Sequence, residues 1–241
     1  MYKGIYIAAS GAVLKQAQLE VISENLANAN TTGFKKDGMS FKEYLLPLDP
    51  AGAPDGRVMS EFSGIKTDFT NGTSFKTGNP LNISIEGAGL IALEGDRYTR
   101  RGDFKKSQDG YLATHDGIKV LGNSGPINLP EGNLVIDQQG KISVISDGLI
   151  AQPIEIDTIK IMDFSASGTV QKSDNGMFTA TGNGTPISTG VHQGYIETSN
   201  VDVVREMVSM ITMMREFESY QKVIQTFDDA MGKVNTDMGR L

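Results

Sequence analysis

The sequence predicts an α+β fold in which N- and C-terminal helices form a discontinuous coiled-coil domain, with an antiparallel all-β domain inserted between them. Three observations lead to this prediction. Apolar residues recur with heptad spacing at both ends of the chain, whereas the middle alternates with a period of two. Glycine supplies 28 of the 241 residues, well above the usual share of about 7%. Most of these glycines lie in the middle of the chain, many of them beside Asp or Asn, which indicates tight turns between short strands.

Residues 1–33 are predicted to form the N-terminal helix of the core domain. Their apolar residues fall seven apart or at the intermediate +3 position, so they line one face, which only Lys15 interrupts. We expect this face to make helix–helix and subunit contacts through Ile5, Ala8, Ala12, Leu19, Ile22 and Leu26. The run "NANTTG" is expected to end the helix, because Gly33 readily adopts a positive φ angle.

The central part of the chain is predicted to contain a linker and then a β domain. Residues 34–67 show little periodicity and include "PLDPAGAPDG", which predicts an extended linker. Residues 68–196 hold short runs rich in β-branched residues, such as "LNISIEG", "LIALEG", "KISVIS" and "PIEIDTIKIMDF". Glycine pairs that favour hairpin turns separate such runs: Asp109-Gly110, Asp116-Gly117, Gln139-Gly140, Asp147-Gly148 and Asn175-Gly176.

Residues 197–241 are predicted to form the C-terminal helix of the core domain, which Asn200 can cap. Its apolar seam consists of Val203, Met207, Met210, Met214, Phe217, Tyr220, Ile224, Phe227 and Met231. Between Phe217 and Tyr220 the step is three where a strict heptad needs four, and such a stammer turns the seam around the helix. A helix of about 38 residues would reach roughly 57 Å, so it needs a partner helix. Its methionines suit either a helix core or an adaptable interface.

The composition argues against most chemical functions. The net charge of −7 and the absence of any basic run longer than a pair exclude a nucleic-acid surface. The chain has no Cys and only two histidines, His115 and His192, so we expect no metal site, no cofactor, no small-molecule substrate and no catalytic residue. The segment Gly87-Ala88-Gly89 resembles a dinucleotide motif, but a strand-like run follows it, so we interpret it as a hairpin turn. No run of about 18 apolar residues exists, and we expect no membrane insertion.

Several motifs resemble the axial rod and hook proteins of the bacterial flagellum. The run "YIAASGAVLKQAQLEVISENLANANTTGFKKD" is similar to the N-terminal motif of that family, and "GYIETSNVDVVREMVSMITMMREFESYQKVIQTFDD" to its C-terminal helix. The runs "YTRRGDFKKSQDGYLAT" and "GPINLPEGNLVIDQQGKIS" are similar to its β domain. The compact length and "YIAASGA" favour a proximal position in the rod, with a distal position as the alternative.

This resemblance implies a structural subunit of the flagellar basal body rather than an enzyme. It implies transit through the flagellar export apparatus without a cleaved signal peptide, and a periplasmic location. The implied partners are copies of the same chain and other flagellar rod proteins. It also implies a loop motif that contacts other subunits, made of Asn25, Asn28, Thr32, Gly33 and Phe34.

The two terminal seams are more than one protomer can cover, so we expect a subunit that polymerises helically through its terminal helices. Two other classes of function remain open at this point. A surface-exposed β-domain binding module, or adhesin, would use the helices only as a stalk. An oxidoreductase would bind a nucleotide at Gly87 and Gly89, and we expect no such binding.

Overall fold

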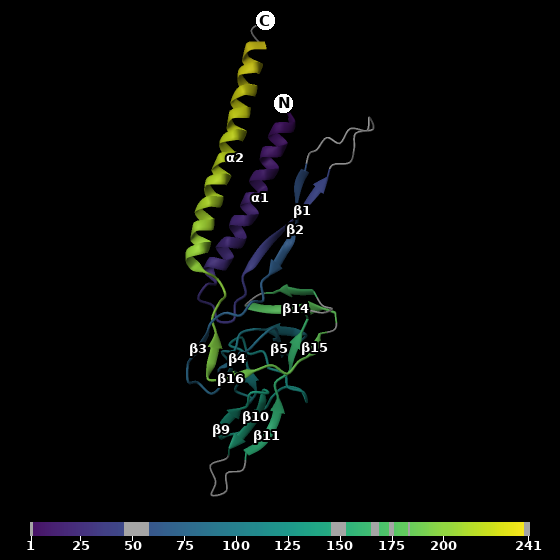
Figure 1. Cartoon of the computed structure of the whole chain (residues 1–241), viewed down its shortest axis with the longest axis vertical. Coiled ribbons are helices and arrows are strands. Elements are labelled where there is room, and N and C mark those ends of the chain that lie inside the picture. The colour runs from purple at the N-terminus through teal and green to yellow at the C-terminus, as the bar shows by residue number, and fades with distance from the viewer. Residues whose placement is uncertain are drawn as a thin grey trace. The chain divides into compact units, whose positions relative to one another are not determined.

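A computed structural model describes residues 2–45, 58–145, 153–164, 169–173, 176–182 and 184–238. Two helices, α1 (Tyr2–Ala27) and α2 (Val203–Met238), flank an antiparallel β-rich region (Figure 1), which is the predicted α+β class. The strands are β1 (Asp37–Leu45), β2 (Val58–Thr67), β3 (Ser74–Lys76), β4 (Ile83–Ile85), β5 (Leu90–Leu93), β6 (Arg97–Thr99), β7 (Lys105–Lys106), β8 (Leu112–Ala113), β9 (Asn133–Ile136), β10 (Lys141–Ile145), β11 (Pro153–Thr158), β12 (Ile161–Asp163), β13 (Thr169–Lys172), β14 (Met177–Thr181), β15 (Thr185–Pro186), β16 (Val191–Gln193) and β17 (Tyr195–Glu197).

The chain divides into two compact units. The helical unit consists of Met1–Ala27, Asp37–Asp68 and Val201–Leu241, and the β unit consists of Asn28–Lys36 and Phe69–Asn200. The chain therefore passes from one unit to the other after residues 27, 36, 68 and 200. These bounds differ from the predicted ones, because residues 28–36, assigned from sequence to the helix and the linker, belong to the β unit.

The two helices of the helical unit lie side by side and antiparallel (Figure 1). Two glycines of α1 permit a close approach. A Cβ atom added at Gly4 would lie 3.0 Å from the Phe227 ring, and one added at Gly11 would lie 2.6 Å from the Tyr220 ring. One turn further along α1, the Lys15 ammonium lies 2.7 Å from a carboxylate oxygen of Glu216. The lysine that interrupts the predicted stripe therefore pairs across the helix contact.

The start of α2 corrects one prediction. Asp202 caps the helix, since its Oδ1 atom accepts a hydrogen bond of 3.1 Å from the backbone N–H of Arg205. Asn200, the predicted cap, instead binds within the β unit. Its Oδ1 atom accepts the backbone N–H of Lys36 at 2.8 Å, and its amide nitrogen donates to the carbonyl of Thr70 at 3.1 Å.

The segment expected as a linker forms a β-hairpin. Strands β1 and β2 pair antiparallel from Asp37 opposite Thr67 to Leu45 opposite Val58, with a register shift after Ser40. The backbone of Asp37 binds the Asn25 side chain, so β1 begins against the end of α1. The weak periodicity of this stretch hid the strands, because a two-stranded hairpin with a bulge does not bury a clean alternating face. The run "PLDPAGAPDG" lies outside the described residues.

The β unit contains only antiparallel strand pairs within the described residues. Its largest sheet has the order β13-β14-β6-β5-β12-β15, and a three-stranded sheet has the order β11-β10-β9. One apolar cluster forms the main core and includes Ile91, Leu112 and Ile142, each fully buried. The four predicted strand runs contain β4, β5, β10, and β11 with β12. The prediction of short antiparallel strands is therefore confirmed.

Glycine turns join several of these strands as predicted. Gly110 lies between β7 and β8 and Gly140 between β9 and β10, both with positive φ. Gly87 also has positive φ, but it connects β4 to β5, which pair with other strands, so the predicted hairpin at this glycine is wrong. The Asp147-Gly148 pair lies outside the described residues.

Among the described residues, neither helix has the length and hydrophobicity that a membrane crossing requires.

Replacing Gly11 with valine should push the helices apart, because even the first added carbon would overlap the Tyr220 ring. We expect the free energy of unfolding of the helical unit to fall by about 1–3 kcal/mol, the usual cost of overpacking. Thermal unfolding followed by circular dichroism measures the change. Gly232→Ala is the matched control, since nothing lies within 4 Å of a Cβ added there. An equal melting temperature for Gly11→Val and the control would show that this close contact is not made in solution.

Candidate functional site

The predicted seam of α1 is covered in the structure. Ala8 and Ala12 are buried, and the other four predicted residues are half-buried: Ile5, Leu19, Ile22 and Leu26. Gly4 and Gly11 also lie against α2, and the sequence analysis missed them. They occur seven apart in the sequence, and small residues at heptad spacing opposite aromatic ones are the signal that would have found them.

The predicted seam of α2 is covered in only one part. Its later residues, from Phe217 onward, are half-buried, as is Met210: Phe217, Tyr220, Ile224, Phe227 and Met231. Its early residues are exposed: Val203, Met207 and Met214. All three exposed residues precede the three-residue step between Phe217 and Tyr220, and that step turns the stripe by about 100° relative to the following residues.

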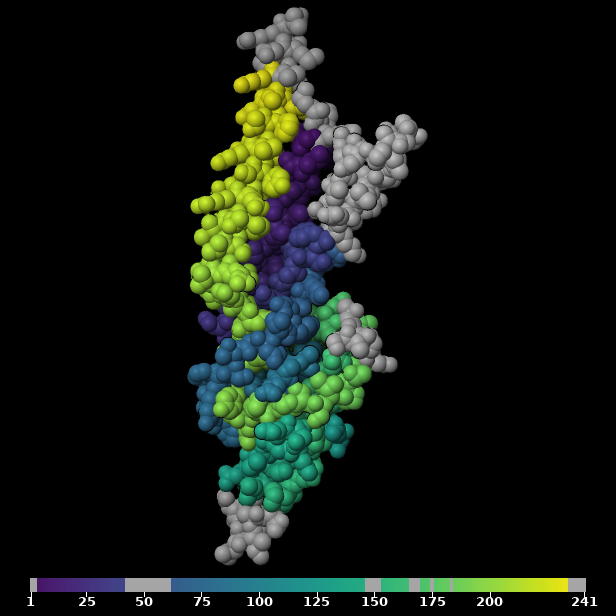
Figure 2. Space-filling model, in the orientation of Figure 1, coloured from purple at the N-terminus to yellow at the C-terminus, as the bar shows by residue number. Residues whose placement is uncertain are grey.

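The first half of α2 carries a second apolar stripe, which sequence analysis did not single out. Val204, Val208 and Ile211 are 72%, 60% and 52% exposed. At about 100° per residue they lie on the side opposite Met213, whose sulfur is 3.8 Å from the Lys15 ammonium of α1. We call Val204, Val208 and Ile211 the outer face of α2. Figure 2 shows α2 along one side of the helical unit, with α1 beside it.

The outer face changes character along α2. After Ile211 the same side carries the exposed charged residues Arg215, Glu218 and Lys222. The side towards α1 is mixed in the first half, since half-buried Glu206 and Ser209 lie there beside half-buried Met210 and Met213. A helix that exposes a stripe of large apolar residues as well is expected where another surface covers that stripe.

The outward side of α1 also exposes large apolar residues. Tyr6 and Val13 are 74% and 68% exposed, and they are seven residues apart on the side away from Gly4 and Gly11. Further along the same side lies exposed Glu20. We call Tyr6 and Val13 the outer face of α1.

A buried ionic network lies in the β unit, near the points where the chain enters and leaves it. The Lys35 ammonium is 2.6 Å from Oε1 of Glu197, and Nε of Arg100 is 2.5 Å from Oε2 of the same carboxylate. All three side chains are buried, with Lys35 only 1% exposed. The backbone N–H of Gly72 donates a third hydrogen bond to the Glu197 carboxylate at 2.8 Å. We call Lys35, Arg100 and Glu197 the buried triad.

The remaining donors of the triad bind backbone carbonyls and the Asn71 side chain, whose Oδ1 atom accepts from Arg100 at 3.2 Å. Lys35 donates to Thr70 at 2.7 Å, and Arg100 donates to Gly89 at 2.6 Å and to Ile85 at 2.7 Å. Removing one partner from such a network leaves a buried charge without compensation, which is costly. The triad therefore holds four segments together inside the β unit: residues 28–36, the chain near residue 70, the residue after β6, and the end of β17.

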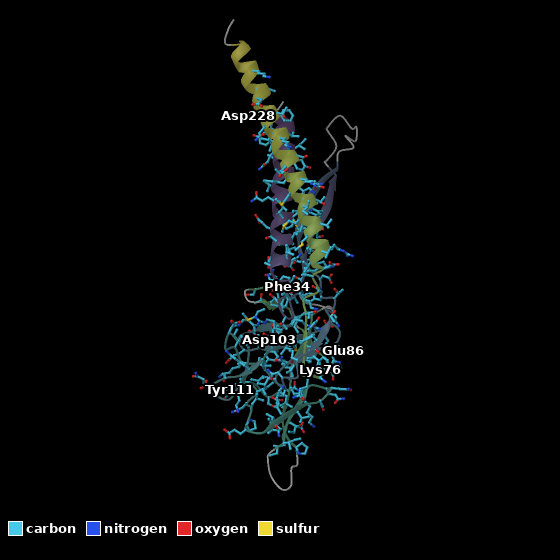
Figure 3. The ribbon with its side chains drawn as sticks, turned by 90° about the vertical axis from the view of Figure 1, so that its left-hand side faces the viewer. Phe34, Lys76, Glu86, Asp103, Tyr111 and Asp228 are labelled. Atoms are coloured by element: carbon cyan, nitrogen blue, oxygen red, sulfur yellow. The ribbon has the colours of Figure 1, made fainter. Side chains whose placement is uncertain are left out.

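The predicted loop motif has partners within this chain. The Asn25 amide donates to the backbone carbonyl of Asp37 at 2.8 Å and accepts the Asp37 N–H at 2.9 Å. Gly33 has a φ of 66°, and a Cβ there would lie 2.5 Å from the carbonyl oxygen of Arg100. Phe34 (Figure 3) is buried in the β unit, with the Lys172 ammonium 3.7 Å from its ring centre.

The other two motif residues are more accessible. Asn28 accepts the Thr31 hydroxyl at 3.1 Å, and both Asn28 and Thr32 are half-buried. The contribution of the motif to contacts between subunits stays a prediction.

The described residues show no group of three or more His, Asp or Glu side chains that could hold a metal ion. Each histidine lies beside one carboxylate: His192 is 2.7 Å from Glu86, and His115 is 3.5 Å from Asp103. The strand β5 follows Gly87 and Gly89 directly, so this segment lacks the helix N-terminus that a dinucleotide pyrophosphate needs.

Three family models match the sequence. "Flagella basal body rod protein" matches residues 5–35, "Flagellar hook protein FlgE/F/G D1 domain" matches residues 84–210, and "Flagellar basal body rod FlgEFG protein C-terminal" matches residues 192–237.

Similar proteins align with the chain over nearly its full length. Flagellar basal-body rod protein FlgF of Caulobacter vibrioides is 30% identical over 98% of this chain and 100% of its own length. Flagellar basal-body rod protein FlgG of Agrobacterium fabrum is 31% identical over 98% of this chain and 99% of its own length. FlgF of Escherichia coli is 31% identical over 98% of both.

The buried triad can be tested by Arg100→Met, which leaves Glu197 buried with one cation fewer. We expect the free energy of unfolding of the β unit to fall by about 3–5 kcal/mol. Urea denaturation followed through the near-ultraviolet circular dichroism of its tyrosines measures the change.

The neighbouring Arg101→Met is the matched control. Arg101 is more accessible and pairs with Asp103 at 2.8 Å, and the hydrogen bond to that carboxylate raises the pKa of the Arg101 guanidinium. Losing such an accessible pair costs about 1 kcal/mol or less. If Arg100→Met were no more harmful than Arg101→Met, the triad would not anchor these segments.

Proposed function

This chain belongs to the flagellar basal-body rod protein family, and we propose that it polymerises helically through its two terminal helices. As a member of this family it is a structural subunit of the flagellar basal body. The proposal adds how the subunit joins others: α1 and α2 form a coiled-coil core domain, and the β unit is an insertion between them. A contact between different surfaces of two copies that does not close into a ring yields a helical assembly.

The observation that carries the proposal is the uncovered first half of α2. Val204, Val208 and Ile211 face water, while the partner helix α1 contacts the opposite side. Burying a Val or Ile side chain fully contributes about 1.5–3 kcal/mol, so covering these three residues favours association by several kcal/mol before the entropy cost. Among the described residues, α1 contacts only the opposite side of α2, and these three side chains are exposed in the single protomer.

The proposal also includes the position of the subunit in the rod and its location in the cell. A proximal position in the rod is supported by the compact length of the chain and by its N-terminal "YIAASGA". We propose a periplasmic location, reached through the flagellar export apparatus without a cleaved signal peptide. The proposed partners are copies of this chain and other flagellar rod proteins. Relatives named FlgF and FlgG resemble the chain to the same degree, which supports a place in the rod.

Replacing Ile211 with aspartate should weaken assembly without unfolding the protomer, since the side chain is exposed in the protomer. We expect the concentration needed for assembly to rise by about tenfold or more, because placing a carboxylate in an apolar contact costs at least about 1.4 kcal/mol. Sedimentation and electron microscopy over a range of protein concentrations measure the effect.

Lys222→Asp is the control for this substitution, because it also introduces a carboxylate on the same side of α2, but in the charged half. It should change the assembly concentration much less than Ile211→Asp. Assembly of Ile211→Asp at the wild-type concentration would contradict the proposed role of the outer face.

A further inference from the structure

We infer that the outer face of α2 is covered by the outer face of α1 from a second copy, displaced along the helix axis by two heptads. The inference rests on the proposed function and adds the identity of the two surfaces and their stagger. Both surfaces belong to the helical unit, and both consist of apolar residues seven apart: Tyr6 and Val13 on α1, and Val204 and Ile211 on α2.

The contacts within one protomer show which residues of α1 and α2 lie at the same level along the helix axis. Gly4 lies against Phe227, Gly11 against Tyr220, and Lys15 against Glu216. Each advance along α1 is therefore matched by an equal retreat along α2, as expected for antiparallel helices. In this register Val13 lies at the level of Glu218, and Glu20 lies at the level of Ile211.

A second copy placed at the same level would make a poor contact. The outer side of its α1 would place the exposed carboxylate of Glu20 against Ile211 of the first copy, and Val13 against the carboxylate of Glu218 of the first copy. Both contacts place a carboxylate against an apolar side chain and partly desolvate it, which is unfavourable. The two outer faces therefore disfavour lateral association without a shift.

A shift of about fourteen residues removes both conflicts. Val13 of the second copy then lies at the level of Val204, and Tyr6 lies at the level of Ile211. Because fourteen residues are two heptads, the same sides of the helices still face each other, as coiled-coil packing requires. At 1.5 Å per residue the stagger between neighbouring copies is about 21 Å.

The geometry of the contact also excludes a closed dimer in which both copies use the same surface. The two outer faces lie on different helices and point away from opposite sides of the helix pair, so covering α2 of one copy leaves α2 of the next copy free. The contact can therefore repeat from copy to copy, each time with the same stagger.

Disulfide cross-linking between single-cysteine variants tests the stagger, because the chain has no native cysteine. Val13→Cys is mixed with Val204→Cys, assembled and oxidised, and the control mixture is Val13→Cys with Glu218→Cys. The staggered pair should give about tenfold more cross-linked dimer than the control, because a disulfide needs Cα atoms within about 7 Å. Tyr6→Cys with Ile211→Cys tests the same register independently, with Tyr6→Cys and Gln225→Cys as its control.

The outcomes separate this inference from the proposed function. Assembly with cross-links only in the staggered pairs supports both. Assembly in which the control pairs cross-link, or in which no pair does, overturns the stagger and leaves polymerisation standing. Failure of the wild-type chain to assemble at any concentration overturns both.

Discussion

One helix can cover only one side of another, and the first half of α2 is apolar on more than one side. The partner α1 contacts the side that carries Met213 and Glu216, so the outer face of α2 stays in water. The glycines of α1 bring the two helices as close as the Tyr220 and Phe227 rings allow, so this side has no room for a further helix. We propose that another chain completes the burial, and this constraint links the sequence of the helices to assembly.

The buried triad addresses a different requirement of the same architecture. The chain passes between its two units after residues 27, 36, 68 and 200, and the segments next to these points must be held. Within the β unit a single carboxylate, that of Glu197, binds Lys35, Arg100 and the N–H of Gly72. Because these groups come from distant parts of the sequence, the β unit cannot be completed until nearly the whole chain is present. We therefore expect a cooperative β unit whose order depends on residues 28–36.

Sequence periodicity predicted the two helices, the short antiparallel strands and several glycine turns, since these depend on local spacing. It also located the stammer near Phe217, where the exposure of the seam changes. It did not find the β1–β2 hairpin, whose strands lack clean alternation, or the buried triad, whose members are 162 residues apart at Lys35 and Glu197. Charged residues inside the motifs "TTGFKKD", "YTRRGDF" and "GYIETSNV" were a usable signal for the triad. The prediction that Asn200 caps α2 was wrong because the Asn200 side chain binds the backbone of Lys36 and Thr70 inside the β unit.

The central claim is that assembly buries the outer face of α2, and the rate of thiol alkylation at Val208→Cys measures this most directly. The account predicts fast alkylation in the free protein, where Val208 is 60% exposed, and a rate at least about tenfold slower in assembled material. Lys222→Cys, on the charged half of the same helix, reports the general effect of assembly on reagent access. Equal alkylation of Val208→Cys in free and assembled protein would contradict the account.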